Sequence, residues 1–384
     1  MDILLIHNKD INYYPPVKSL ISILAELGHR VTLITYDGYG YKEEVRDQEN
    51  IQMIGLESFK YKGKIKSFFN VFFFRRNIRR KISELLPSYD VIWTTTDTTI
   101  SMVGKVLLHC DNHIMQLMEL VEDAPLYSYD IIYKLHLNKR LRVSLDKYAR
   151  HARCVVVPEY NRAHITATMW GLNKVPYILP NKPYKIEIND PPQDIIDTVE
   201  NIKSQGKKII LYQGIFLKER RLDEFAEAVR MLGDDYVLCI VGRDRQERKE
   251  LCEKYPEIIY VPFIKPPYHL LLTQIAHIGI LTYFPTSDNL MGRLNVIYCA
   301  PNKIYEYAYC GLPMIGNDIP GLSGPFDKYH IGKCFDNLDK TDIAETIKEI
   351  EEDYEMMKAS CRMFFDEIDL KVQVSNILND ITNK

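Results

Sequence analysis

The chain has 384 residues, of which 46% are hydrophobic, and its 49 basic and 52 acidic side chains give a net charge of −3. This length exceeds one ordinary core and suits two α/β domains, and the lack of a basic excess argues against a nucleic-acid-binding protein. The eight cysteines form no Cys-x-x-Cys pair and the first residues show no basic, apolar leader, so we expect a cytoplasmic protein with reduced thiols.

Short apolar runs alternate with amphipathic helical stretches in the N-terminal half, as in a parallel sheet covered by helices on both faces. These runs predict strands at residues 3–6, 31–35, 51–56, 91–94, 154–157 and 177–179. A helix is expected over 17–27, ending at Gly28. No Gly-x-Gly-x-x-Gly follows the first strand, which argues against a nicotinamide or flavin oxidoreductase.

The segment 58–83 contains no acidic residue and interleaves basic with aromatic side chains. This composition suits an anionic membrane surface, where each Lys or Arg contributes on the order of 1 kcal/mol. The residues expected at the membrane are Lys60, Lys62, Lys64, Lys66, Phe68, Phe69, Phe72, Phe73, Phe74, Arg75, Arg76, Arg79 and Arg80. Alternatively, the phenylalanines form the core face of the domain's third helix and the charges its solvated face.

Between residues 181 and 208 the composition shifts to proline and scattered acids, which predicts a linker with one short helix. We therefore expect an N-terminal domain over 1–181, a linker over 182–207 and a C-terminal domain over 208–360. A helix in 361–384 is a candidate to pack back on the N-terminal domain.

The second half restarts with a strand from residue 208 that runs into Gly214, and Arg220 follows six positions later. A glycine at a strand's end lets backbone amides approach a phosphate, which a nearby cation can clamp. A turn glycine before a solvated basic helix is the alternative. Further strands are expected at 237–242, ending in Gly242, and at 260–264 and 278–282.

Lys303 and Glu306 lie one turn apart on a helix expected between Pro301 and Gly311. On such a face a cation can neutralise a phosphate while the carboxylate accepts hydrogen bonds from two vicinal hydroxyls, as a ribose diphosphate requires. Spacing alone favours an ordinary solvated ion pair.

The segment Pro301-Asn302-Lys303-x-x-Glu306-Tyr307, followed by Gly311-x-Pro313-x-Ile315, resembles the donor-binding segment of GT-B glycosyltransferases, specifically family 4 and its relatives. The resemblance implies the α/β GT-B fold, with two Rossmann-like domains facing across a cleft. It also implies a donor site made of Gly214, Lys218, Arg220, Arg221, Gly242, Arg243, Phe263, Ile264, Asn302, Lys303 and Glu306.

Within that implied site, Glu306 would bind the ribose, and Gly214 and Arg220 the diphosphate. The base would lie near Gly242, Arg243 and the turn at Phe263 and Ile264. The family's cation directly after the glycine is Ile215 here, so Lys218 or Arg221 would supply that charge. Many members carry a Glu where this chain has Tyr298, a departure that favours a subgroup.

The resemblance extends to catalysis. Arg220 and Lys303 would stabilise the departing nucleoside diphosphate without a metal. No carboxylate cluster predicts a metal site, since Asp97 and Asp111 are isolated. Glu119 ends a segment that resembles the family's cleft-facing acidic one and is the acceptor-side candidate, the alternative being a glutamate on a helix surface. Residues Glu159 and Arg162 also match a family segment, with a structural role as the alternative.

The resemblance implies a hexosyltransferase-like enzyme, a retaining glycosyltransferase without a cofactor, and the basic aromatic segment predicts that it is peripheral on the cytoplasmic membrane face. It would move a sugar from a nucleoside-diphosphate sugar to a lipid-linked or growing surface-glycan acceptor, as in capsule or O-antigen synthesis. Two alternatives remain open: a nucleotide-binding GT-B scaffold without turnover, and a GT-B nucleotide-sugar epimerase.

Overall fold

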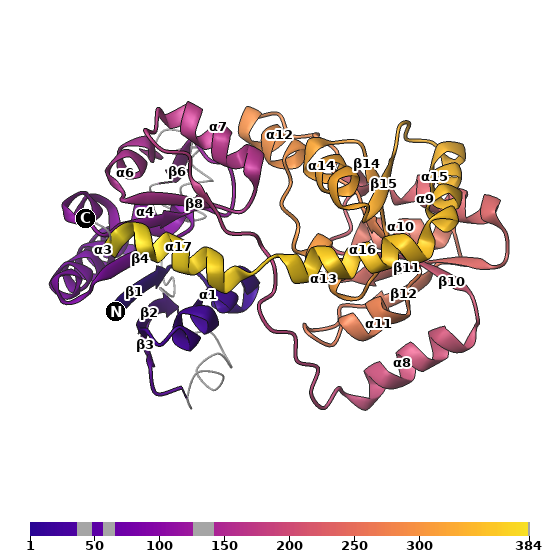
Figure 1. The fold of residues 1–384 in the computed structure, drawn as a ribbon, viewed down its shortest axis with the longest axis horizontal. Coiled ribbons are helices and arrows are strands. Elements are labelled where there is room, and N and C mark those ends of the chain that lie inside the picture. Colours follow the sequence, from indigo (N-terminus) through magenta and orange to yellow (C-terminus); the bar gives the residue numbers. More distant parts are fainter. Residues whose placement is uncertain (37–47, 57–65, 126–141, 383–384) are drawn as a thin grey trace. The chain divides into compact units, whose positions relative to one another are not determined.

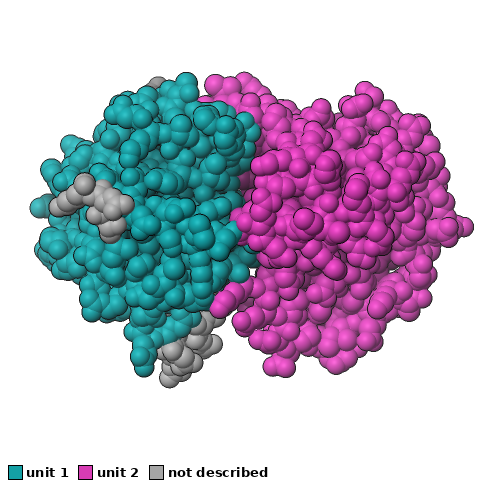
Figure 2. Space-filling model, viewed as in Figure 1, with its two compact units in different colours: residues 1–184, 369–384 teal, residues 185–368 magenta. Residues whose placement is uncertain are grey.

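The computed structural model describes residues 1–36, 48–56, 66–125 and 142–382. The chain divides into two compact units (Figure 2). Unit 1 contains residues 1–184 and 369–384, and unit 2 contains residues 185–368. The prediction of two α/β domains is confirmed.

Unit 1 is built on a sheet of seven parallel strands in the order β3-β2-β1-β4-β5-β8-β9 (Figure 1). Its elements are β1 (Asp2–His7), η1 (Ile11–Tyr13), α1 (Pro15–Glu26), β2 (Arg30–Tyr36), β3 (Ile51–Leu56), α3 (Lys66–Leu85), η2 (Leu86–Ser88), β4 (Val91–Thr95), α4 (Asp97–Val103), η3 (Gly104–His109), β5 (His113–Gln116), β6 (Asp123–Pro125), β7 (Arg142–Ser144), α6 (Asp146–His151), β8 (Cys154–Val157), α7 (Tyr160–Trp170), β9 (Tyr177–Ile178) and α17 (Leu370–Thr382). Strands β6 and β7 form a separate antiparallel pair.

Unit 2 carries a sheet of six parallel strands in the order β12-β11-β10-β13-β14-β15. Its elements are α8 (Gln193–Ser204), β10 (Lys208–Gln213), η5 (Lys218–Arg220), α9 (Leu222–Leu232), β11 (Tyr236–Gly242), α10 (Gln246–Lys254), β12 (Ile259–Pro262), α11 (Leu270–Ile275), β13 (Ile278–Leu281), α12 (Leu290–Ile297), α13 (Asn302–Tyr309), β14 (Met314–Asn317), α14 (Pro320–Tyr329), β15 (Gly332–Phe335), α15 (Lys340–Glu352) and α16 (Tyr354–Glu367).

The central strands are buried on both faces. Along β10, Ile209 and Leu211 join one buried apolar cluster, while Ile210 and Tyr212 join another on the opposite face. Because alternate side chains of a strand point to opposite faces, helices must cover both. This explains why the strands read as continuous apolar runs in the sequence.

Both sheets share one topology. In each unit the first strand lies in the middle, the second and third follow on one side and the fourth and fifth on the other. The strand order therefore reverses between β1 and β4 in unit 1 and between β10 and β13 in unit 2. In open α/β sheets, ligands bind outside the carboxyl ends of the strands at such a switch point.

The C-terminal end of the chain completes unit 1. The predicted helix over 361–384 is in fact two elements, because residues up to 367 continue α16 of unit 2. Helix α17 packs along α1 (Figure 1), where the Lys371 ammonium lies 2.7 Å from the Glu26 carboxylate. Its Val374, Ile377 and Leu378 side chains are buried.

The six predicted strands of the N-terminal half are all present, with each end within one residue of the prediction. Strand β5 was not anticipated, since its sequence, His-Ile-Met-Gln, mixes polar with apolar residues although all four are buried. Glu119 follows this strand in a loop, so the alternative of a helix-surface glutamate is wrong. No helix among the described residues is long and apolar enough to cross a membrane.

Candidate functional site

Arg220 lies at the switch point of unit 2. Its guanidinium donates to the carbonyl of Thr282, directly after β13, and the Thr282 hydroxyl donates to the Arg220 carbonyl at 2.9 Å. The guanidinium carbon also lies 4.4 Å from the centroid of the Tyr283 ring. These contacts hold the cation at the carboxyl edge of the sheet, where the sequence predicts a diphosphate clamp.

Gly214 and Gly242 bring two strand ends into backbone contact at the same edge. The Gly214 amide donates to the Val241 carbonyl at 3.0 Å. A Cβ atom on Gly242 would lie 2.2 Å from the Gly214 carbonyl oxygen, closer than real atoms approach. Glycine is therefore required at 242, and this edge presents backbone where a side chain would obstruct a ligand.

Glu306 is the centre of a buried ionic cluster. Its carboxylate side chain is only 14% exposed, and its Oε2 lies 3.1 Å from the Lys303 Nζ and 3.2 Å from the His269 Nε2. Burial alone would raise the carboxyl pKa, but Lys303 and His269 outweigh it and hold the pKa of Glu306 well below its usual range. The pair is thus desolvated and charged, unlike an ordinary surface ion pair.

Helix α13 sets this geometry and matches the prediction. It begins at Asn302 after Pro301, and Gly311 has a φ of +67° just beyond its end. Tyr307 packs against Gly279 of β13, where an added Cβ would lie 2.5 Å from its ring. The helix is thereby fixed against the sheet with Lys303 and Glu306 on one face.

The remaining predicted donor residues differ in their environment. Arg221, in a left-handed conformation with a φ of +52°, forms an ion pair with Glu224, whereas Lys218 is exposed. The Arg243 guanidinium carbon lies 5.1 Å from the centroid of the Phe263 ring, which is 52% exposed. Ile264 beside it is buried. An exposed aromatic ring covered by a guanidinium is a surface on which a planar base can stack.

A small pocket of about 210 Å³ lies at the switch point of unit 1. Its lining residues are Lys9, Tyr14, Thr96, Asp97, Leu117, Met118, Glu119 and Val121. The Glu119 carboxylate lies 3.0 Å from the guanidinium of Arg162, which is itself only 3% exposed. The Glu119 side chain is itself 61% exposed, so desolvation by the surrounding chain raises the pKa of its carboxyl only in part against Arg162, which acts the other way. The structure thus joins two of the predicted residues, Arg162 and Glu119, in one ion pair.

Sequence reasoning missed Lys9, Asp97 and His269. Asp97 follows Thr96, which has a φ of +70° that a β-branched residue rarely adopts, and burial raises the pKa of the Asp97 carboxyl. The only available signal was position, since Lys9 and Asp97 follow predicted strands. No group of three or more His, Cys, Asp or Glu side chains able to hold a metal ion occurs within residues 1–36, 48–56, 66–125 and 142–382.

The predicted membrane segment is only partly described. Lys60, Lys62 and Lys64 lie outside the described residues, whereas 66–85 form α3. On this helix Arg76 and Arg80 are exposed, and Ile78 and Ile82 are buried in the core. Arg79 donates to the carbonyls of Met102 at 2.8 Å and Ser101 at 3.1 Å. Its charge thus holds α3 on α4, a role that neither the membrane prediction nor the alternative of a solvated charge gave to this residue.

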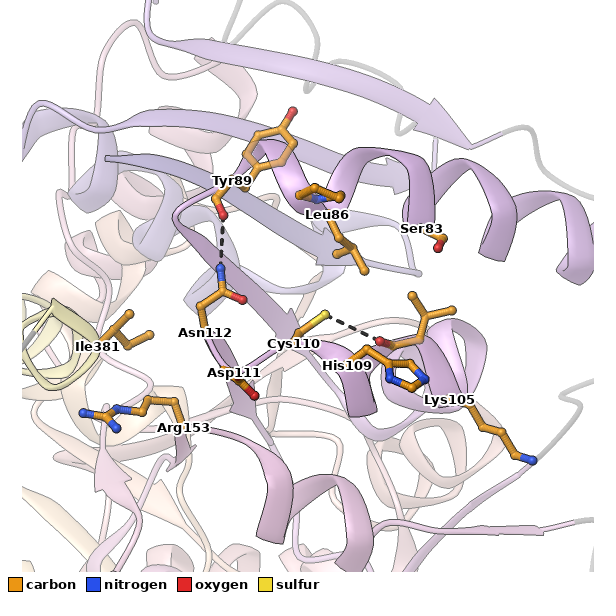
Figure 3. A pocket seen from close by; sticks show the side chains of 12 residues that line it. Ser83, Leu86, Tyr89, Lys105, His109, Cys110, Asp111, Asn112, Arg153 and Ile381 are labelled. Carbon is orange, nitrogen blue, oxygen red and sulfur yellow. Dashed lines mark hydrogen bonds between the residues drawn. The ribbon is translucent and has the colours of Figure 1, made fainter. Parts of the chain in front are cut away.

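A larger pocket of about 880 Å³ lies at the opposite edge of the unit 1 sheet (Figure 3). Asn112 and Arg153, which line it, come directly before β5 and β8, so the pocket sits at the amino ends of these strands. The Asn112 side-chain amide donates to the Tyr89 carbonyl at 3.0 Å. Ligands of such sheets bind at the other edge, so this pocket is not the candidate site.

Residues 195–361 match the family described as glycosyl transferases group 1. No curated protein matches the chain by sequence. Among solved structures, HepE of Anabaena in complex with UDP-glucose is 13% identical over 100% of both chains, with a TM-score of 0.68. Sucrose-phosphate synthase of Thermosynechococcus elongatus is 16% identical over 100% of this chain and 99% of that one, with a TM-score of 0.67.

WaaG, a glycosyltransferase involved in lipopolysaccharide biosynthesis, is 13% identical over 100% of both chains, with a TM-score of 0.60. The matched family region contains Gly214, Arg220, Lys303 and Glu306. The family match and the fold agree with the resemblance found in the sequence. The chain therefore has the GT-B fold, and residues 195–361 of unit 2 match the group 1 glycosyltransferase family.

Proposed function

We propose that this chain is a retaining glycosyltransferase that moves a sugar from a nucleoside-diphosphate sugar to a lipid-linked or growing surface-glycan acceptor. The observation that carries the proposal is the desolvated cluster of Lys303 and Glu306 at the carboxyl edge of the unit 2 sheet, the edge that also holds Arg220. HepE, which was solved with UDP-glucose, and WaaG, which is involved in lipopolysaccharide biosynthesis, support the donor and acceptor classes.

In the donor site, Glu306 accepts hydrogen bonds from the ribose hydroxyls. Arg220 and Lys303 bind the diphosphate, together with the first amides of α13 from Asn302 onward. The bare strand ends at Gly214 and Gly242 leave room for the nucleotide. Stacking at Phe263 holds the base, and Lys218 rather than the paired Arg221 supplies the additional charge.

The chemical step is departure of the nucleoside diphosphate as its bond to the anomeric carbon breaks. Negative charge then accumulates on the leaving phosphate, where Arg220 and Lys303 stabilise it more strongly than in the ground state. Two cations at this edge can perform this role, so we propose transfer without a metal or cofactor. Retention of the anomeric configuration follows from the family 4 resemblance.

On the acceptor side, Glu119 orients or deprotonates the attacking hydroxyl. A raised carboxyl pKa suits a general base, because proton transfer is most effective when the pKa approaches the working pH. Asp97 and Lys9 line the same pocket and supply further polar contacts. The exposed Arg76 and Arg80 on α3 would hold the enzyme on an anionic membrane, on the cytoplasmic face, where a lipid-linked acceptor is found.

Two residues favour the alternative of a nucleotide-binding scaffold without turnover. Ile215, which is 60% exposed, stands where the family places a cation, and Tyr298 stands where many members carry a glutamate beside the donor sugar. A scaffold would bind the donor and release no product.

The experiment that tests the proposal is thermal denaturation of the chelator-treated protein with UDP, GDP, dTDP, ADP or CMP. A ligand at 100 times its dissociation constant stabilises the fold by about 2.7 kcal/mol, which is readily measured as a shift in Tm. A selective shift identifies the base, and incubation with the matching nucleotide sugars and a prenyl-diphosphate-linked sugar then tests turnover. Binding without turnover supports the scaffold, and no shift at millimolar nucleotide refutes the donor site.

A further inference from the structure

His269 is the unexpected member of the cluster around Glu306. It lies directly before α11, 37 residues from Glu306 in the sequence, and is only 7% exposed. Its Nε2 and the Nζ of Lys303 approach the same carboxylate oxygen, Oε2, at 3.2 and 3.1 Å. Neither donor uses Oε1, so the second oxygen of the carboxylate is not taken up by these two groups.

The backbone of His269 is tied to the switch point. Its carbonyl accepts from the Gln213 Nε2 at 3.3 Å and from the Thr273 hydroxyl at 3.2 Å. Gln213 is the last residue of β10 and also donates to that hydroxyl at 3.0 Å. The backbone that carries the imidazole is thus held by the last residue of the strand that precedes the predicted phosphate turn at Gly214.

The two donors on Oε2 restrain the carboxylate differently. Lys303 is a flexible ammonium on the same helix as Glu306, whereas His269 comes from another element and carries a planar ring with a fixed N–H direction. The His269 Nδ1 is buried and has no hydrogen-bond partner among the described residues. The contact of Nε2 with Glu306 is thus the one hydrogen bond that orients this ring among the described residues.

We propose that His269 is a positioning residue for ribose recognition: it fixes the Glu306 carboxylate so that Oε1 accepts a hydrogen bond from a ribose hydroxyl. This inference rests on the proposed donor site. A histidine that merely balanced the buried charge of Glu306 would affect the stability of the protein and the binding of every ligand equally. A positioning residue affects the contribution of the ribose hydroxyls alone.

The experiment compares the tightest-binding of UDP, GDP, ADP and dTDP with its 2′,3′-dideoxy counterpart by titration calorimetry. The proteins are the wild type, His269→Ala, His269→Gln and, as matched control, Tyr268→Phe, whose hydroxyl bonds the Asn189 carbonyl instead. A hydrogen bond to a charged group corresponds to a loss of about 10-fold or more in affinity, so the wild type should prefer the natural nucleotide by that factor.

In His269→Ala the preference should fall to within about 2-fold, because the carboxylate is no longer oriented. His269→Gln, which can still donate, should recover part of it, and Tyr268→Phe should keep it. If His269→Ala does not fold, the glutamine variant and the control decide. A preference in His269→Gln below that of the wild type, with an unchanged preference in Tyr268→Phe, supports the role of His269, whereas a full preference in His269→Gln refutes it. An unchanged preference in a folded His269→Ala refutes the role of His269 and leaves the proposed donor site intact. A wild type that binds no nucleotide refutes both the donor site and the role of His269.

Discussion

Replacing Glu306 by glutamine tests the centre of the donor site. The side chain keeps its size and one acceptor oxygen but loses the charge that Lys303 and His269 stabilise. Because the carboxylate is only 14% exposed, water screens its hydrogen bonds weakly. A hydrogen bond to a charged group contributes about 1.5–3 kcal/mol, so nucleotide binding should weaken roughly 10- to 150-fold.

The assay is titration calorimetry at pH 7 with the nucleoside diphosphate selected by thermal shift. Glu349→Gln is the matched control, because it breaks an ion pair of 3.0 Å with Lys333 on the surface of the same unit. That pair is exposed, so the control should change stability by about 0–1 kcal/mol and leave binding unaffected. Equal affinities for the wild type and Glu306→Gln, with both proteins folded, would refute the assignment of Glu306 to the ribose.

Three further outcomes are expected. Gly242→Ala should lower the free energy of unfolding, measured in urea, by about 1–3 kcal/mol, because the new Cβ would overlap the backbone of Gly214. The control Gly324→Ala in α14, which has open space around it, should be neutral or stabilising. Equal effects of the two substitutions would contradict the close approach at 242. Burial lowers the pKa of His113 from 6.5 to about 3, so the unfolded chain takes up this proton at a higher pH than the folded protein, and stability falls as the pH drops below about 6.5. Between pH 6 and 5, His113→Gln should therefore reduce the dependence of the unfolding free energy on pH by about 1.4 kcal/mol per pH unit. An unchanged dependence would contradict this assignment. Arg76→Ser with Arg80→Ser should weaken flotation with anionic vesicles about 10- to 30-fold without changing Tm, with neutral vesicles as control, and retention would return α3 to the core alternative.

The local signals of the sequence were sufficient for most of the fold. Apolar runs identified the central strands because parallel strands buried on both faces need apolar side chains at nearly every position. Helix α13 was predicted because its start at Pro301 and its end at Gly311 depend on residues within the helix itself. Lys303 and Glu306 share a face for the same reason, since helical geometry alone brings residues three apart together.

The parts that were missed depend on packing between distant segments. His269 reaches Glu306 only because the residue before α11 and helix α13 meet at one edge of the unit 2 sheet, and no local pattern marks it. Arg79 was read as part of a basic surface, but its guanidinium satisfies two carbonyls near the end of α4. Asp97 was interpreted as an isolated acid, although the turn after β4 places it in one pocket with Glu119.

The assignment of residues 369–384 to unit 1 has a consequence for how the chain matures on the ribosome. Unit 2 is complete once residue 368 has been made, whereas unit 1, begun first, still lacks α17 and the buried side chains of Val374 and Ile377. Domains usually fold as units in order of synthesis. Here the order of completion is inverted, because α17, which packs on α1, is synthesised after all of unit 2.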